Sequence, residues 1–453
     1  MSNEVIYNKW LLYIAIFFAA IGGMLYGYDI GIINGALLPI QKEFNLSYTQ
    51  LSFLAGSVLY GGAFATLFSG YLADIFGRKK MIITSAIIFI ISIFIIYMAT
   101  GYTSLFIGRL VQGISVGIIT IVIPLYITET VPSHIRGRAT VSFQLMLTFG
   151  IVFANAASIF FIDTGSAANW RGMFLTALIP GLVMLVGSFL LVRSPRWLSM
   201  KGDLKSSLNI LLKTREKSQA HKEFQSISES VKHHATSESF YKLFLKKQYL
   251  KPILIVFGIA ILGQLTGINS FLQMSSIFLT QAGLHSAMGA MIGTTVATGL
   301  NFGITIISII IADKIERKHI VSIGTLGVVI ALLFCAVVSF SLPESPLKGY
   351  LLLTGILLFI IFYAIGPGAF IWVILSELLP NLVRSKAMAM ALFFNSLASA
   401  ILASAFLPMS NIIGFSGMFL FCAFTTTIYF LIAVFLIPKT TGKSLEEIEA
   451  SFE

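Results

Sequence analysis

The chain has 453 residues, of which 57% are hydrophobic and only 11% charged, and its mean hydropathy is +0.91. This composition excludes an ordinary soluble domain and is typical of a protein with many membrane-spanning helices. The formal net charge of +11 is concentrated in short polar segments between apolar runs, so it indicates membrane topology rather than affinity for nucleic acid.

Twelve apolar runs are long enough for the ~20 residues that a helix needs to cross the hydrocarbon core. The first lacks the cleavage pattern of a secretory signal and is followed by more spans, so we expect it to be retained as the first span. The sequence therefore predicts an all-α membrane protein with spans near 11–37, 51–73, 81–100, 104–128, 138–162, 172–192, 251–280, 287–312, 319–341, 349–378, 386–409 and 414–437.

The basic residues orient these spans. With both termini on one side, 26 of the 30 Lys and Arg residues lie on that side, while Lys42, Arg171 and Lys348 lie opposite. The positive-inside rule then predicts that both termini are cytoplasmic. Short outward loops favour a bacterial inner membrane. Both cysteines, Cys335 and Cys422, fall within spans, which predicts packing residues rather than a disulfide.

An internal repeat divides the chain. "LADIFGRKKMI" (72–82) is similar to "IADKIERKHIV" (311–321), and "ETVPSHIRGRA" (129–139) is similar to "ELLPNLVRSKA" (377–387). These motifs follow the same spans in each half, which indicates a parallel repeat of two six-helix bundles with a substrate site between them. We expect bundles at 1–192 and 251–437, a cytoplasmic linker with short helices at 193–250, and a cytoplasmic tail at 438–453.

The repeated loop motifs place acidic residues beside basic ones at helix ends. Basic residues alone would be ordinary positive-inside flanks. The acids are unexpected there, so we predict a gate whose ion pairs form in one conformation only. Within it, we expect Glu129 to pair with Arg136 and Glu377 with Arg384, seven residues apart in each motif. The candidate residues are Asp74, Arg78, Glu129, Arg136, Asp313, Arg317, Glu377 and Arg384.

Two charged residues lie well inside the spans. Asp29 is ~27 Å along its helix from Leu11, and Arg109 is close to the outer start of the fourth span. Both are therefore expected at similar depth, where they can pair. Such a pair either fixes helix packing or serves the transport cycle, and the second interpretation is favoured because apolar residues would pack at lower cost.

Uncharged polar residues in the spans suit an uncharged, polyhydroxylated ligand, because amides both donate and accept hydrogen bonds. Singly, each also fits a hydrogen bond between helices. Gly and Pro in "GQLTGIN" (263–269) and "GPGAFIW" (366–372) predict broken helices that line a cavity. The candidate ligand residues are Gln144, Gln264, Asn269, Gln273, Asn301, Asn395 and, as an aromatic face, Trp372.

Across nearly its whole length the chain resembles the sugar porter family of the major facilitator superfamily. The resemblance rests on motifs in matching order: "GYDIGIINGA", "LADIFGRKK", "GRLVQG", "ETVPSHIRGR", "SPRWL", "GQLTGIN", "GPGAFIW" and "TGKSLEEIEA". It implies that Gln144, Gln264, Asn269, Asn301, Trp372 and Asn395 bind sugar. It also implies that Asp29, with Arg109 as partner, couples transport to protons.

The chain departs from the family pattern at several positions. Gly263 replaces the first Gln of a paired motif, Gln273 and Met274 replace paired Tyr residues, and Arg193 and Lys439 replace acids of the cytoplasmic charge network. The first two departures bear on which sugar is bound. The last predicts a weaker gate.

The resulting prediction is a monomeric symporter that imports a hexose, pentose or inositol across a lipid bilayer, driven by the proton gradient and without a cofactor or metal. A facilitative uniporter with the same site is the main alternative, and a sugar sensor without transport is a weaker one. An enzyme is not expected, because the sequence shows no nucleophile–base pair, metal-ligand cluster or phosphate loop.

Overall fold

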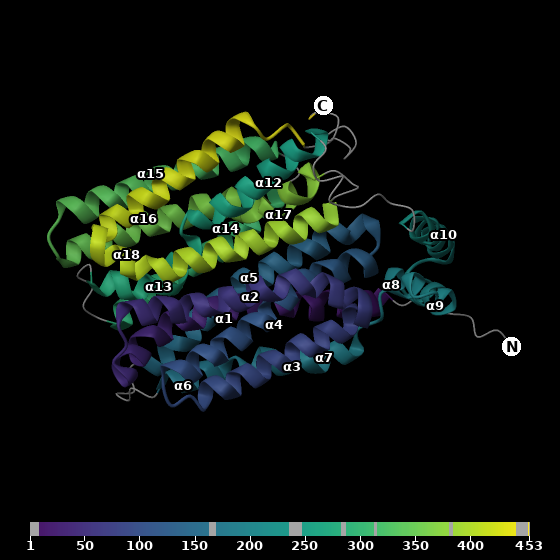
Figure 1. Ribbon diagram of the computed structural model, residues 1–453, viewed down its shortest axis with the longest axis horizontal. Helices are drawn as coiled ribbons and strands as arrows, with labels where there is room; N and C mark the ends of the chain where they lie inside the picture. The colour runs from purple at the N-terminus through teal and green to yellow at the C-terminus, as the bar shows by residue number, and fades with distance from the viewer. Residues whose placement is uncertain are drawn as a thin grey trace.

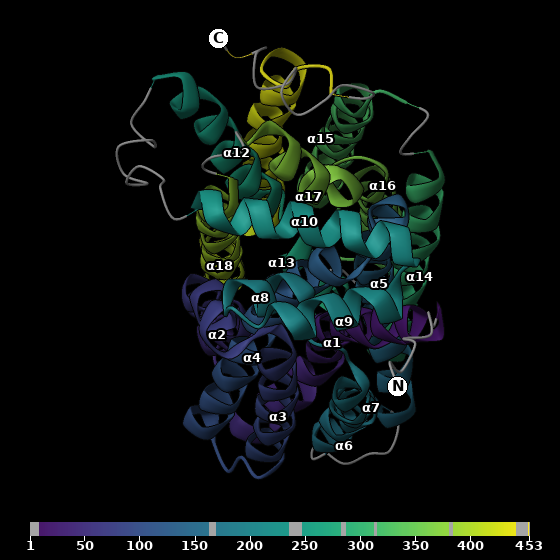
Figure 2. The ribbon, with the colours of Figure 1, turned by 90° about the vertical axis from the view of Figure 1, so that its right-hand side faces the viewer.

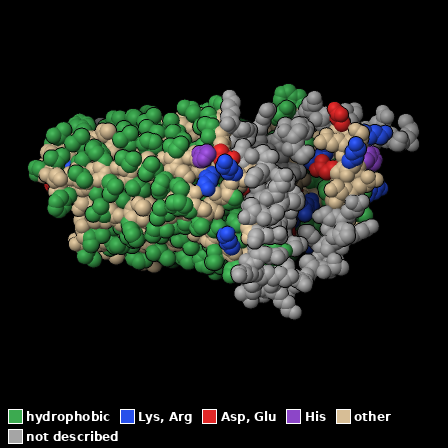
Figure 3. Space-filling model, turned by 90° about the horizontal axis from the view of Figure 1, so that it is seen from above, with side chains coloured by type: hydrophobic (Ala, Val, Ile, Leu, Met, Phe, Trp, Pro, Cys, Tyr) green, Lys and Arg blue, Asp and Glu red, His purple; other side chains and the backbone are tan. Residues whose placement is uncertain are grey.

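The computed structural model describes residues 9–162, 169–234, 247–281, 287–311, 315–379, 384–440 and 452. Most of its helices run along the long axis of the molecule and form two bundles that lie side by side (Figure 1). Three short helices, α8, α9 and α10, lie beyond one end of the bundles. This end is called the linker end here, and the other the opposite end. Hydrophobic side chains cover the body, and the visible charged side chains gather toward the linker end (Figure 3).

The N-terminal bundle contains α1 to α7, and the linker contributes α8, α9 and α10. The predicted sixth span is split in two at Ala177. The bounds are α1 Lys9–Phe44, α2 Tyr48–Phe76, α3 Arg78–Tyr97, α4 Tyr102–Thr130, α5 Ser133–Ile162, α6 Asn169–Thr176, α7 Leu178–Leu190, α8 Pro195–Met200, α9 Leu204–Thr214 and α10 Lys217–His234.

The C-terminal bundle contains α12 to α18. The predicted seventh span is divided into α12 and α13, and the tenth into α16 and α17. The bounds are α12 Lys247–Leu265, α13 Ile268–Gln281, α14 Ala287–Ile311, α15 Arg317–Ser341, α16 Pro346–Ile365, α17 Pro367–Leu378 and α18 Arg384–Phe435.

Among the described residues, 11 helices are long and apolar enough to cross a membrane. The count agrees with twelve predicted spans because α18, with 52 residues, contains the last two. At about 1.5 Å per residue such a helix would be more than twice as long as the hydrocarbon core is thick. Gly414, at φ 72° and ψ 166°, interrupts it where one span ends and the next begins.

Small residues let the helices of the N-terminal bundle approach closely. Gly23, Gly27, Gly31 and Gly35 recur at every fourth position and therefore lie on one side of α1, which packs on α5. A Cβ at Gly27 would lie 1.8 Å from the Leu147 carbonyl oxygen, so no larger side chain fits there without displacing a backbone. This is the packing expected in a membrane, where small residues favour helix association.

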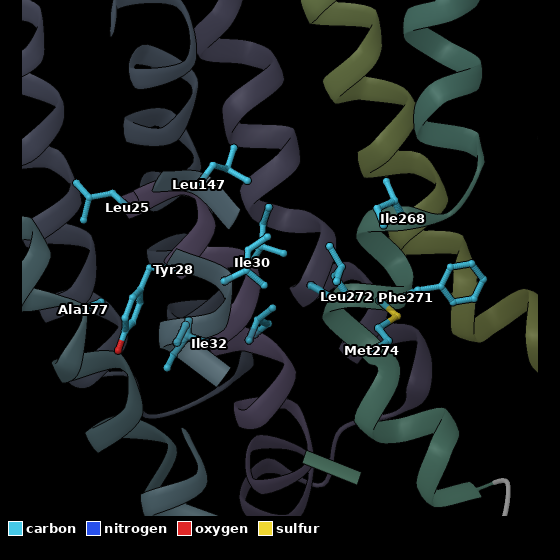
Figure 4. Close-up of a cluster of buried hydrophobic side chains, with 14 of the residues drawn as sticks. Leu25, Tyr28, Ile30, Ile32, Leu147, Ala177, Ile268, Phe271, Leu272 and Met274 are labelled. Atoms are coloured by element: carbon cyan, nitrogen blue, oxygen red, sulfur yellow. The ribbon is translucent and has the colours of Figure 1, made fainter. Parts of the chain in front are cut away.

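An apolar core extends across both bundles. Leu25, Tyr28 and Ile30 of α1 belong to the same buried cluster as Leu272 and Met274 of α13, and Figure 4 shows these two groups of side chains on their respective helices. The two cysteines are buried and unpaired, as predicted.

Candidate transport site

Both predicted helix breaks are present, and glycine is required at each. Gly267, between α12 and α13, has φ +91°, and a Cβ there would meet the Phe271 ring at 2.7 Å. The break leaves the Leu265 carbonyl without a helical partner, and this oxygen accepts a hydrogen bond from Thr425 Oγ1 at 2.9 Å. Gly366 separates α16 from α17, and a Cβ there would lie 2.8 Å from the Gly324 Cα.

The break at Gly267 brings three of the predicted ligand residues together. Gln264, at the end of α12, donates from Nε2 to Asn395 Oδ1 of α18 at 3.2 Å. Asn269, at the start of α13, donates to Gln264 Oε1 at 2.9 Å and to Ser399 Oγ at 2.8 Å. Asn395 in turn donates to the Ala260 carbonyl at 2.9 Å. We call Gln264, Asn269, Asn395 and Ser399 the amide network.

The remaining predicted ligand residues lie on α5, α13, α14 and α17. Gln144 lies on α5 and Asn301 on α14, two helices that meet through the Phe149 and Phe302 rings, whose centroids are 5.7 Å apart. Gln273 is buried on α13, and its Oε1 has no hydrogen-bond partner. The side chain of Trp372 lies outside the described residues.

The predicted pairing of Asp29 and Arg109 is confirmed. Arg109 Nη1 donates to Asp29 Oδ1, and both side chains are at most 1% exposed. The same nitrogen donates to Gln112 Oε1 at 2.9 Å. The Phe174 ring lies 5.7 Å from the guanidinium carbon, which provides a cation–π contact.

In each bundle, an ion pair joins one repeated loop motif to the other. The sequence suggested Glu129 with Arg136 and Glu377 with Arg384, each acid with a basic residue of its own motif. Among the described side chains, Arg78 Nη2 lies 2.7 Å from Glu129, and Arg317 Nη1 lies 2.7 Å from Glu377. Each pair joins one repeated motif to the other within the same bundle. The side chains of Arg136 and Arg384, and all of Asp313, lie outside the described residues.

The N-terminal ion pair also anchors the linker. Arg78 binds Asp74 at 2.9 Å, and Ser194 Oγ donates to Glu129 Oε2 at 2.5 Å. Ser194 is the N-cap of α8, where it accepts a hydrogen bond from Trp197 N at 3.0 Å. One acid thus connects α4 to the arginine at the start of α3 and to the cap of a linker helix. Arg193, the predicted departure, is exposed beside this site.

Hydrogen bonds between the two bundles occur toward the opposite end. Asn34 of α1 accepts from Ser276 N at 3.1 Å and Ser275 Oγ at 3.3 Å, and its carbonyl oxygen accepts from Ser276 Oγ at 2.8 Å. Ser52 Oγ of α2 accepts from Leu407 N of α18 at 3.2 Å. Gly56 lies on the same contact, since a Cβ there would be 2.5 Å from Ser404 Oγ.

Asn34 and Gln112 were not selected from the sequence, although both are buried and polar within predicted spans. Asn301 was selected as an uncharged polar residue within a predicted span, and Asn34 and Gln112 meet the same condition. What sequence could not supply was their position relative to the other bundle and to Arg109.

The family described as "Sugar (and other) transporter" matches residues 15–452. The "Glucose transporter GlcP" of Staphylococcus epidermidis is 33% identical over 443 residues, covering 98% of this chain and 97% of that protein. The "Galactose-proton symporter" of Escherichia coli is 30% identical over 444 residues, covering 98% and 94%.

A solved structure of the proton:xylose symporter XylE, bound to 6-bromo-6-deoxy-D-glucose, superposes with a TM-score of 0.82 at 27% identity, covering 99% of this chain and 100% of that one. An inward-open structure of XylE from E. coli gives a TM-score of 0.81 at 27% identity, covering 98% and 100%.

Proposed function

The chain belongs to the sugar (and other) transporter family of the major facilitator superfamily, and from this premise we propose that it carries a monosaccharide or cyclic polyol together with protons by alternating access. It is a multi-pass membrane transporter, not an enzyme. Proton-coupled relatives for galactose and xylose support the coupling, and the buried ion pair between Asp29 and Arg109 is the observation that carries it.

The amide network is the proposed sugar site. Its side chains now hydrogen-bond to one another, and a sugar hydroxyl, which both donates and accepts, can replace each of these partners. Such an exchange keeps the number of buried hydrogen bonds unchanged, so binding is not opposed by unpaired polar groups. Gln144, Gln273, Asn301 and Trp372 are proposed to complete the site from α5, α13, α14 and α17.

The orientation of the protein in the membrane follows from the distribution of its Lys and Arg residues. We propose that the linker end faces the cytoplasm of a bacterial cell, because it carries most of the basic residues. The opposite end, closed here by Asn34 and its partners, would then face outward. A sugar would enter when these contacts separate and leave when the linker end opens.

Asp29 is the proposed proton carrier. A carboxylate in a fully buried site is stabilised by Arg109, so separation of the two side chains favours protonation. Movement of one proton through ~100 mV supplies ~2.3 kcal/mol, which corresponds to a roughly fifty-fold sugar gradient for a one-to-one stoichiometry.

Transport into proteoliposomes tests this proposal. D-glucose, D-galactose, D-xylose and myo-inositol should be offered with and without an inward proton gradient, and we expect one or more to accumulate only with the gradient. Asp29→Asn keeps the shape of the side chain but removes the titrating group, so it should abolish accumulation and sugar-induced proton uptake while exchange continues. Accumulation by Asp29→Asn vesicles would place the coupling elsewhere, and gradient-independent equilibration by the wild type would identify a uniporter.

The sugar site is tested in the same vesicles. Gln264→Ala or Asn395→Ala should weaken binding by about 1–3 kcal/mol, since each leaves a buried partner without a hydrogen bond. Ser410→Ala, which loses only a bond to its own helix at Leu407 O, is the matched control. Unchanged affinity in both amide variants would reject the assignment.

A further inference from the structure

Gln112 is a buried amide that the proposed coupling does not yet use. It is 0% exposed on α4, one turn after Arg109. Its Oε1 accepts from Arg109 Nη1 at 2.9 Å, the same nitrogen that donates to Asp29. One nitrogen of the guanidinium therefore has two acceptors, one of which is charged and one neutral.

The rest of the guanidinium offers no alternative anchor. Among the described residues, the buried Arg109 Nε and Nη2 have no hydrogen-bond partner, and neither has Asp29 Oδ2. The hydrogen bonds that hold Arg109 in this site thus run through Nη1 to Asp29 and Gln112. If Asp29 is neutralised, its carboxyl oxygen becomes a weaker, uncharged acceptor, and Gln112 is the second acceptor that still holds that nitrogen.

We propose that Gln112 is a positioning residue that holds Arg109 while Asp29 takes up its proton, and that it thereby sets the pH at which coupling operates. The inference rests on the proposed proton coupling. Without Gln112, protonation of Asp29 would leave the Nη1 of a buried cation with only an uncharged carboxyl oxygen as acceptor, which is costly. Protonation would be resisted, and the coupling would require a lower pH.

Among the described residues, few charged or titratable side chains lie near Asp29. Arg109 of α4 is its cationic neighbour, and Tyr26 and Tyr28 lie on α1 itself. Tyr363 of α16 interacts electrostatically with Tyr26. The groups that face this part of α1 from α5 are Leu147 and Ile151, and Phe174 of α6 lies over the guanidinium, all of them uncharged. Gln112 is thus the neutral acceptor on Arg109 Nη1 in this surrounding.

Two variants should move the pH dependence in opposite directions. Gln112→Leu removes the neutral acceptor, so the midpoint pH of sugar-induced proton uptake should fall by about one unit, as expected for one charge-assisted hydrogen bond. Gln112→Glu places a second carboxylate on Arg109, which favours neutral Asp29, so the midpoint should rise. A merely structural residue would not give shifts of opposite sign.

The measurement uses purified full-length protein in weakly buffered solution, with proton uptake recorded from pH 5 to 9 on addition of D-glucose, D-galactose, D-xylose or myo-inositol. Ser115→Ala is the control, because Ser115 is equally buried on α4 but donates to the Ser85 carbonyl at 2.7 Å instead of contacting the pair. Its midpoint should equal that of the wild type. If Gln112→Leu does not fold, the shift in Gln112→Glu alone decides.

Unchanged midpoints, or shifts of the same sign in both Gln112 variants, would overturn the inference while leaving proton coupling intact. Absence of proton uptake by the wild type with all four compounds would overturn both. Loss of uptake in Asp29→Asn together with opposite shifts at Gln112 would support both.

Discussion

The two ends of the molecule are held together in different ways. At the opposite end, Asn34 and Ser52 make hydrogen bonds from the N-terminal bundle to the C-terminal one. At the linker end, the ion pairs Arg78–Glu129 and Arg317–Glu377 each join helices of a single bundle. Contacts between bundles must break during alternating access, whereas contacts within a bundle can persist. Among the described residues, hydrogen bonds between the bundles are thus found toward the opposite end, and the ion pairs of the linker end stay within one bundle.

The linker strengthens this contrast. Arg215 is buried and binds Glu223 of α10 at 2.6 Å, and its Nη1 donates to the Thr130 carbonyl at the end of α4 at 2.8 Å. The cap of α8 reaches the same region through Glu129. Viewed from the linker end, α8, α9 and α10 lie in front of the two bundles (Figure 2). The linker is thus fastened to the N-terminal bundle at its first helices.

The largest expected effect comes from breaking the N-terminal ion pair. Arg78→Leu would leave Glu129 charged and buried, which costs about 3–5 kcal/mol. Arg317→Leu removes the equivalent pair, whose side chains are 16% and 18% exposed, and should cost only roughly 1 kcal/mol. Thermal unfolding of the detergent-solubilised protein should show a clearly lower midpoint for Arg78→Leu. Equal losses would mean that burial does not distinguish the two pairs.

A smaller effect is expected at the closed end. Asn34→Ala removes hydrogen bonds to Ser275 and Ser276, which should favour opening by about 1–3 kcal/mol, or roughly five- to 150-fold. A cysteine introduced by Ser404→Cys should then react faster with a membrane-impermeant thiol reagent. Asn155→Ala, which removes the Asn34 contact within the same bundle, is the control. A labelling rate in Asn34→Ala no higher than in that control would remove Asn34 from the gate.

The smallest effect concerns the linker. Ser194→Ala removes the cap of α8 and its bond to Glu129, and should cost about 1 kcal/mol. Limited trypsin digestion at Arg196 or Lys201 should become faster. Asp203→Ala removes the cap of α9 instead, and the pKa of Asp203 is lowered by its hydrogen bonds to Ser206. Since this cap makes no bond to the bundle, cleavage at Arg196 should not change, and an equal increase would show that capping alone matters.

Some of these features could be predicted from the sequence because they depend on properties along a single helix. Depth in the membrane follows from residue count, so Asp29 and Arg109 were expected to meet. Gly267 and Gly366 interrupt apolar runs, so breaks were expected there. The fold class followed from twelve apolar runs and a repeated pair of motifs.

The partners of Glu129 and Glu377 could not be predicted in this way. Both acids have an arginine seven residues later, and the sequence favoured these local pairs. Arg78 and Arg317, the partners among the described side chains, come from other helices that tertiary packing brings alongside. Asn34 was missed for a related reason: an amide shows its donors and acceptors in the sequence, but not which helix receives them.

The packing of α1 has a consequence for biosynthesis. Arg109 is 80 residues after Asp29, so at ~5–20 residues per second it is synthesised about 4–16 s later. The α5 backbone that the glycines of α1 pack against follows later still. During this interval α1 occupies the translocon or the bilayer without its partner helices. A carboxylate is expensive there, whereas a carboxylic acid is far less so. The residue proposed to carry protons in the mature transporter is therefore expected to enter the membrane in its neutral form and to ionise only after α4 arrives.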